Sequence, residues 1–287
     1  MNTLLAAGSA LIVSTVALGV QERPQGPPVG KGPNSQTQTD GEQQRFVQDL
    51  AAAVMPLVEQ AAARKFTAAP KIVVGAPEAL QAAMEEEVRQ TLRRLYPNAK
   101  PEHVEQDVAA SGIRSDGYVV KYAPTTKAVY VLPERIESIL QSLKLDNPGT
   151  EPLLRILLAH ELAHALQDQE VGLAQLTAAA DQQTENVGRM IVEGHAMWTH
   201  RKVTERLDLS AARKPAEMVL ALQWKPSWDK PIFDVLAYRG IFLSGFKFME
   251  HHAAIGGAER LWKILQSPPR TTAEVVQPAT FKLPGEE

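Results

Sequence analysis

The chain is organised around the stretch LLRILLAHELAHALQDQ, residues 153–169. Its leucine, isoleucine and alanine residues would surround a helix on almost every side, which is typical of a helix buried in the centre of a domain. Pro152 just before it suits a first helical turn. Against this apolar background stands the pattern His160-Glu161-Leu162-Ala163-His164. The spacing of four residues brings both imidazoles to one face of the helix, one turn apart.

Two imidazoles on one helix face can bind a single Zn²⁺, with Glu161 beside a water molecule on the ion. Zinc lowers the pKa of such a water to about 7, and a neighbouring carboxylate can accept its proton as the water attacks a polarised carbonyl. The alternative is a pair of histidines bonded within the core. Burying His, Glu and His together would then cost several kcal/mol unless each polar group found a partner. The motif therefore predicts a catalytic zinc site.

The composition limits the class of protein and the kinds of ligand. A chain of 287 residues with 44% hydrophobic residues can form one large or two small domains with a proper core. The net charge of -3, the pI near 6.2 and the absence of a long basic run argue against a nucleic-acid partner. The chain has no cysteine, so a metal must be bound by His, Glu or Asp.

Residues 1–19 are predicted to be a signal peptide. The run from Leu4 to Val20 is apolar and uncharged, and Ala17 and Gly19 fit the small-residue positions of a cleavage site after Gly19. No Lys or Arg precedes the run, and its 17 residues are the lower limit for a spanning helix, so an uncleaved membrane anchor through residues 4–20 is the alternative. We expect a protein that is exported to the periplasm or outside the cell. Residues 20–42, rich in Pro, Gly and Gln, predict a disordered linker.

Residues 43–112 are predicted to be mainly helical. Apolar residues recur at helical spacing from Gln43 to about Lys65, with Pro56 as a kink or break. The run KIVV, residues 71–74, predicts a short buried strand. Another amphipathic pattern runs from Pro77 to Tyr96, and Pro97 ends it.

A β-hairpin is predicted just upstream of the zinc helix. Two β-rich runs, Tyr118 to Tyr122 and Ala128 to Leu132, flank a Pro-Thr-Thr-Lys turn. A sheet edge beside a metal site can bind an extended peptide as an added strand through backbone hydrogen bonds. A hairpin that only covers the core has the same sequence pattern, so both interpretations stay open.

Mostly helical segments are expected on both sides of the zinc helix. A short helix from Pro133 to Leu143 and a turn at 146–149 precede it. The segments that follow it are one long helix from Leu173 to about Leu209, a second from about Phe233 to His252, a turn at Gly256-Gly257, a short helix from Ala258 to Leu265, and an extended covering tail from Pro268 to Glu287.

Two histidines are too few for catalytic zinc, which usually has three protein ligands and an open fourth position. Glu193 is the predicted third ligand, because its helix can cross the zinc helix and Gly194 next to it permits close helix approach. Glu185 and His195 are the rival candidates. Asp168 lies one more turn along the His160/His164 face, too far to share the ion, and is predicted to orient His164 instead.

HELAHALQDQ followed by a helix containing VEGHA resembles the gluzincin-type zinc metallopeptidases. It is especially similar to a group of poorly characterised exported bacterial gluzincin-like proteins with H-E-L-x-H-A-L-Q-D-Q and E-G-x-A motifs. The segments YAPTTKAVYVL and SPPRTTAEVVQP are also similar to that group, so the resemblance spans about residues 115–282. It implies that His160, His164 and Glu193 bind zinc and that Glu161 is the general base.

The sequence departs from the family pattern at two positions. His195 stands where an acidic residue is expected after E-G, and Met197 stands where the thermolysin branch has an Asp four positions after the ligand Glu. The acidic residue that supports the first ligand histidine in the thermolysin branch is therefore not found at position 197 of this chain, and His160 lacks that partner there. The resemblance also places Tyr238 where it would stabilise the oxyanion, with Arg239, His251 and His252 as alternatives. His103 and His200 are expected to be ordinary surface residues.

The sequence thus predicts a mostly helical α+β protein. Residues 113–287 would form a zincin-like metallopeptidase domain, with a small hairpin-bearing sheet and long helices around the zinc helix, and residues 43–112 its helical N-terminal part. The predicted activity is zinc-dependent hydrolysis of a peptide or protein substrate. The alternatives are a non-catalytic exported binding protein that retains the fold, and a zinc hydrolase of non-peptide amides or esters.

Overall fold

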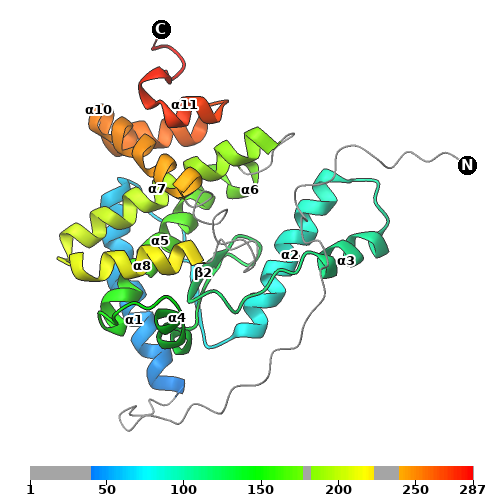
Figure 1. Cartoon of the computed structure of the whole chain (residues 1–287), viewed down its shortest axis with the longest axis vertical. Coiled ribbons are helices and arrows are strands. Elements are labelled where there is room, and N and C mark those ends of the chain that lie inside the picture. Colours follow the sequence, from blue (N-terminus) through cyan, green and yellow to red (C-terminus); the bar gives the residue numbers. More distant parts are fainter. Residues whose placement is uncertain (1–39, 177–181, 223–238, 287) are drawn as a thin grey trace, which may run out of the picture.

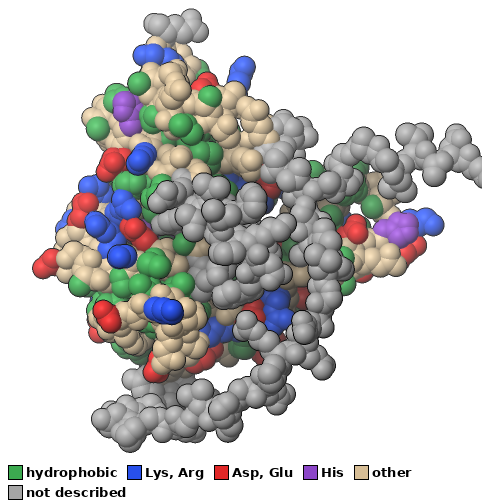
Figure 2. All heavy atoms as spheres, in the orientation of Figure 1, with side chains coloured by type: hydrophobic (Ala, Val, Ile, Leu, Met, Phe, Trp, Pro, Cys, Tyr) green, Lys and Arg blue, Asp and Glu red, His purple; other side chains and the backbone are tan. Residues whose placement is uncertain are grey.

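The computed structural model describes residues 40–176, 182–222 and 239–286. Helices surround one buried central helix, and a small sheet lies against it (Figure 1), so the predicted mostly helical α+β class is confirmed. No helix in these three ranges is both long and apolar enough to cross a bilayer. The predicted signal peptide, residues 1–19, lies outside them. Figure 2 shows acidic and basic side chains mixed on the described part of one face.

The central helix is α5 (Thr150–Val171), and it confirms the helix predicted around the HExxH motif. Gly149 and Gly172 flank it with φ of 102° and 72°, values that favour glycine. Every side chain from Ile156 to Asp168 is buried. Helices α1 (Asp40–Ala62), α7 (Gln182–Arg206) and α8 (Ser210–Leu222) pack against α5. The site helix therefore has apolar partners on most of its sides.

Helix α1 differs from its prediction at its beginning. Of the predicted kink or break at Pro56, a break is absent, because the helix continues through this exposed proline and water can reach the carbonyl that lacks its usual amide partner. It also begins at Asp40, so the predicted linker over 20–42 is too long at its C-terminal end.

The sheet has three strands in the order β1-β3-β2. Strand β2 (Val120–Ala123) pairs antiparallel with β3 (Ala128–Val131), which confirms the predicted hairpin, and β1 (Lys71–Val74) pairs parallel with β3. Only the central strand β3 is buried along its whole length. The prediction of a buried β1 is wrong in this respect, because β1 lies at an edge and its burial is only partial. Strand β2 is the opposite edge.

Helices α2 (Pro77–Leu95) and α3 (Pro101–Ala110) form an arm beside the sheet (Figure 1). The bounds of α2 confirm the predicted helix from Pro77 to Tyr96. The arm has a small apolar core of its own, made of Val88, Leu92, Val104 and Val108. The first half of α2 packs on β2 instead, through Leu80, Ala83 and Met84, and so belongs to the wall of the site.

The remaining helices agree with the predictions in part. The short helix before α5 is a 3₁₀ turn, Pro133–Arg135, followed by α4 (Ile136–Ser142). The helix predicted from Leu173 to Leu209 is described as α6 (Leu173–Leu176) and α7, on either side of residues 177–181. Helix α8 was not predicted. The tail is not simply extended, because a capping box between Thr271 and Glu274 begins α11 (Thr272–Val276), which a 3₁₀ turn (Pro278–Thr280) follows.

Helix α7 crosses α10 (Ser244–Gln266) at a contact between two glycines. A Cβ atom at Gly194 would lie 2.3 Å from both the carbonyl carbon and the carbonyl oxygen of Gly245. Gly194 therefore permits a close helix approach, as predicted, but the partner is α10 and not the zinc helix. A turn of π-helix, Arg239–Leu243, leads into α10, and non-helical angles at Gly256 and Gly257 break it where the turn was predicted.

Candidate metal centre

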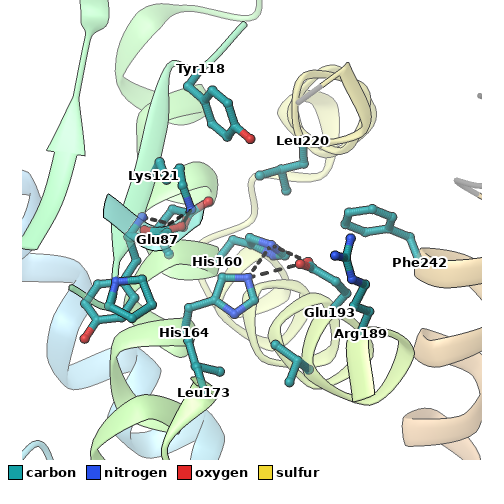
Figure 3. Close-up of a pocket in the computed structure, with 14 residues that line it drawn as sticks. Glu87, Tyr118, Lys121, His160, His164, Leu173, Arg189, Glu193, Leu220 and Phe242 are labelled. Carbon is teal, nitrogen blue, oxygen red and sulfur yellow. Dashed lines mark hydrogen bonds and ion pairs between the residues drawn. The ribbon is translucent and has the colours of Figure 1, made fainter. Parts of the chain in front are cut away.

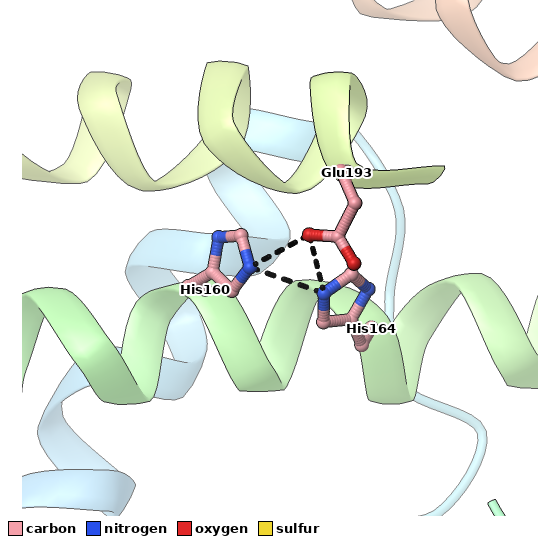
Figure 4. Close-up of side chains that lie close together, drawn as sticks. All are labelled: His160, His164 and Glu193. Carbon is pink, nitrogen blue, oxygen red and sulfur yellow. Dashed lines mark hydrogen bonds and ion pairs between the residues drawn. The ribbon is translucent and has the colours of Figure 1, made fainter. Parts of the chain in front are cut away.

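Helices α5 and α7 lie side by side and bring together His160, His164 and Glu193 (Figure 4). The two Nε2 atoms are 3.1 Å apart, and Glu193 Oε2 lies 3.3 Å from that of His160 and 3.5 Å from that of His164. Three ligands of a tetrahedral ion lie about 3.3 Å from one another when each bond is about 2.0 Å. The three donor atoms are therefore spaced as ligands of one ion, and Glu193 is correctly predicted as the third member of the cluster.

The hydrogen bond to His164 determines which of its nitrogens can bind a metal. Gln167 Nε2 donates to the carbonyl of Val192 at 2.9 Å, so the amide oxygen of Gln167 faces His164 Nδ1, 2.8 Å away. That oxygen only accepts, so Nδ1 of His164 carries a proton, and Nε2 presents a lone pair whenever the imidazole is neutral. The lone pair points at Glu193 and at His160 Nε2 (Figure 4).

These converging atoms need a positive charge between them. Lone pairs and a carboxylate oxygen that converge within 3.1 to 3.5 Å repel one another unless a proton or a cation lies between them. Burial lowers the pKa of His160 to about 3, whereas Glu193 outweighs burial and raises the pKa of His164 to about 9, so without a metal a proton on His164 supplies this charge. The donor set of two imidazoles and one carboxylate fits a divalent transition metal.

Asp168 does not have the predicted role. Its carboxylate accepts from the Tyr122 hydroxyl at 2.7 Å, from Lys127 Nζ at 2.5 Å and from the Leu173 amide at 3.1 Å, while Gln167 takes the position next to His164 Nδ1. The prediction followed the spacing of four residues, but the residue three positions after His164 lies on the same helix face. The orienting group is therefore Gln167, and Asp168 ties α5 to the hairpin.

Glu161 lies beside the cluster and is held by the edge strand. Its Oε2 accepts a hydrogen bond of 2.7 Å from the backbone N–H of Tyr122 on β2. Burial raises the pKa of Glu161, and His164, Lys121 and the Tyr122 N–H oppose this rise. A carboxylate with a raised pKa accepts a proton more readily than an exposed one, which suits a general base beside a candidate metal site.

A cavity of about 260 Å³ opens onto Glu161 and the three donor residues (Figure 3). Lys121 from β2 and Glu87 from α2 stand on one wall, with Lys121 Nζ 3.4 Å from Glu87 Oε2 and 3.2 Å from the Tyr122 carbonyl oxygen. Burial alone would lower the pKa of Lys121, but Glu87 and other nearby groups raise it, so the ammonium stays charged. The remaining lining includes Tyr118, Arg189, Leu220 and Phe242.

The rival ligands lie elsewhere on α7. Glu185 lies two turns before Glu193 and pairs with Arg189. His195 is buried against Trp198 and Trp262, and its Nδ1 lies 2.9 Å from Gln167 Nε2. Neither residue belongs to the cluster that His160, His164 and Glu193 form in the described part of the chain.

The predicted oxyanion donor, Tyr238, lies outside the described residues, as does the side chain of Arg239. Of the alternatives, His251 is exposed and His252 packs near the C-terminus, where its Nδ1 accepts from Arg260 at 3.2 Å. Tyr118 is a phenol that does line the cavity (Figure 3). Burial raises its pKa, so its hydroxyl keeps its proton and can donate it in a hydrogen bond.

His200 was expected at the surface, and that expectation is wrong. Its side chain is completely buried, and its Nδ1 lies 3.1 Å from Nδ1 of the predicted ligand His160. His103, by contrast, is exposed as predicted. A signal for His200 was present in the sequence, because it follows Glu193 by seven residues, two helical turns, and so shares its face of α7.

No protein-family model matches the chain, and no curated protein matches it. A solved structure from Chloroflexus aurantiacus, provisionally described as a hydrolase with a novel fold, is similar with a TM-score of 0.57. The alignment covers 85% of this chain and 90% of that one, at 14% sequence identity. The two proteins therefore share an overall fold.

Proposed function

We propose that this protein is a zinc-dependent metallopeptidase with a zincin-like domain. The observation that carries the proposal is the convergence of His160 Nε2, His164 Nε2 and Glu193 Oε2 next to a buried Glu161 that does not belong to the cluster. A purely structural metal site has no need of a buried carboxylate that does not bind the ion. The similarity to a protein described as a hydrolase agrees with this class of reaction.

The residues of the chain divide the work as follows. Zinc held by the three donors would polarise the carbonyl under attack and acidify a water molecule. Glu161 accepts the proton of the attacking water and delivers it to the leaving amine, and the Tyr122 N–H keeps its carboxylate in place. Lys121 and Tyr118 line the same cavity and can donate hydrogen bonds to the developing oxyanion, in addition to the earlier candidate Tyr238.

A peptide is the proposed substrate, and the edge strand β2 is the proposed place for its backbone. Among the strands of residues 40–176, 182–222 and 239–286, β2 pairs with β3 on one side and has no strand on the other. The outward N–H of Tyr122 already bonds Glu161, so a bound peptide would have to pair with the rest of that edge. Export through residues 1–19 is also part of the proposal and is tested separately below.

The proposal is tested by metal analysis and a peptide-library cleavage assay on the same preparations. We expect about one zinc per chain and zinc-dependent cleavage by the wild type. Glu161→Gln should keep its zinc and lose about 10²- to 10⁴-fold in rate, because only the general base is removed. Glu151→Gln changes an exposed glutamate of the same helix and should leave the rate unchanged.

The ligand and the base should fail in different ways. Glu193→Ala leaves the ion with two imidazoles, so its zinc affinity should fall and excess zinc should restore part of the activity. Added zinc should not rescue Glu161→Gln. Full activity of Glu161→Gln would contradict the proposal in favour of a non-catalytic protein. Cleavage of amide or ester substrates in place of peptides would leave the chemistry intact and correct the substrate.

A further inference from the structure

We propose that His200 and Glu217 form a relay that orients the proposed metal ligand His160. The relay runs through three helices, from His160 on α5 to His200 on α7 and Glu217 on α8. It rests on the proposed metal site. Neither residue touches the cluster donors of Glu193 or His164, so both act through His160 as positioning residues.

The first link is the contact between two imidazoles. His160 Nδ1 lies 3.1 Å from His200 Nδ1, and the rings are 5.3 Å apart between centroids. If His160 binds a metal through Nε2, its Nδ1 carries the proton, because a neutral imidazole has one donor and one acceptor nitrogen. His200 Nδ1 must then accept. His200 therefore has to carry its own proton on Nε2.

The second link selects that proton position. Glu217 Oε1 lies 3.7 Å from His200 Nε2, too long for a hydrogen bond but close enough to favour a proton on Nε2 over Nδ1. His200 is completely buried, so water does not screen this interaction. The carboxylate at one end of the relay thus favours the tautomer of His160 that leaves Nε2 free for the ion.

Glu217 is itself firmly held and negatively charged. Arg201 donates to both of its oxygens, at 2.7 and 3.1 Å, in a bidentate pair. Burial would raise the pKa of Glu217, but His200 and Arg201 lower it to about 2. The guanidinium of Arg201 in turn lies over the ring of Phe246, 3.8 Å from its centroid. The relay is therefore anchored at its outer end by a pair that packing keeps in one geometry.

The relay is tested by measuring the zinc affinity of purified variants in competition with a chelator. His200→Leu removes the acceptor and should weaken zinc binding about 10- to 100-fold. His200→Asn keeps an oxygen near the position of Nδ1 and should restore most of the affinity. Glu217→Gln removes the negative charge that favours the Nε2 proton of His200, and should weaken binding in the same direction but less, because the acceptor His200 remains. Glu205→Gln alters an exposed glutamate near the end of α7 and should change nothing.

A second measurement separates orientation from simple loss of packing. Long-range ¹H–¹⁵N spectra of histidine-labelled, zinc-loaded protein should show His200 protonated on Nε2, and Glu217→Gln should populate the other tautomer. The relay would be overturned, and the metal site would stand, if His200→Leu and Glu217→Gln both bound zinc as tightly as wild type. The same holds if His200 of the wild type were protonated on Nδ1. A wild-type protein that binds no zinc would overturn the metal site and the relay together. Urea unfolding of each metal-free variant reports whether it folds. If His200→Leu does not fold, Glu217→Gln still decides the test.

Discussion

At the scale of single residues, the candidate centre depends on groups that bind no metal. Gln167 is completely buried and uses its amide fully, accepting from His164 Nδ1 and donating to the carbonyl of Val192. This amide therefore fixes the tautomer of one ligand and joins α5 to α7 at the same point. Loss of a partner of this kind typically weakens metal binding 10- to 100-fold.

Gln167→Met is expected to weaken zinc binding about 10- to 100-fold, because it keeps the volume of the side chain and removes both amide groups. Asp168→Asn should leave zinc affinity close to wild type, since Asp168 bonds Tyr122, Lys127 and Leu173 rather than a ligand histidine. Chelator competition measures both. Tight binding by Gln167→Met with loss of zinc in Asp168→Asn would show that the original assignment from the sequence was right.

At the scale of elements, the position of Glu193 depends on how α7 crosses α10. The crossing has no room for a side chain at Gly194 or Gly245, so the two backbones are in direct contact. Helix α7 carries the proposed ligand Glu193 together with His200 of the relay and Arg201, which holds Glu217. A shift of this helix would displace all three.

Gly194→Ala should therefore destabilise the protein by about 1–3 kcal/mol or more, which is typical of overpacking. In a helix without this contact, alanine in place of glycine would stabilise the helix by up to about 1 kcal/mol. A decrease in stability would therefore report the contact with Gly245. Gly117→Ala is the matched control, because a Cβ there meets nothing within 4 Å. Urea unfolding checks the prediction. If Gly194→Ala unfolds at the same urea concentration as Gly117→Ala, the glycine contact does not constrain α7.

At the scale of the whole molecule, the buried histidines make the stability of the metal-free protein depend on pH. Burial lowers the pKa of His160 and of His195 to about 3 and that of His252 to about 4. The unfolded chain therefore binds more protons than the folded one as the pH falls below about 6.5, and stability decreases. His164 acts in the opposite sense, because its pKa is raised to about 9 in the folded protein. Its protonated form stabilises the fold, and this stabilisation is lost as the pH rises toward 9.

We expect the urea midpoint of the metal-free protein to be highest near neutral pH and to fall toward both pH 4.5 and pH 9. His252→Leu should reduce the loss on the acid side, because one buried neutral imidazole is removed far from the metal cluster. His103→Leu, at an exposed position, should leave the profile unchanged. A midpoint that is constant or increases from pH 6.5 to pH 4.5 would contradict this account.

The fate of the N-terminus is a separate prediction at this scale. If residues 1–19 are a cleaved signal peptide, the mature exported protein begins at Val20. Amino-terminal sequencing of protein recovered from its natural compartment checks this. A sequence that begins at Met1 or Asn2 would indicate an uncleaved anchor or a protein that is not exported.

The sequence by itself determined the features that depend on local spacing. The spacing of four residues placed His160 and His164 on one face of α5, and β-rich runs around turn residues predicted the hairpin. Apolar residues on almost every side of α5 indicated that it is the central helix. These are properties of one helix or one hairpin, so neighbours along the chain are sufficient to specify them. Glu193 was also identified, although with rivals.

Only the tertiary structure decided which groups meet across elements. Three contacts depend on the angle and distance at which helices and strands pack. They are the hydrogen bond of His164 to Gln167 instead of Asp168, the hydrogen bond of the Tyr122 N–H to Glu161, and the contact of His200 with His160. Residues at i+3 and i+4 share a helix face equally well, so periodicity does not choose between Gln167 and Asp168. The choice follows from which neighbour each faces, α7 or the hairpin, and packing across the whole chain sets those neighbours.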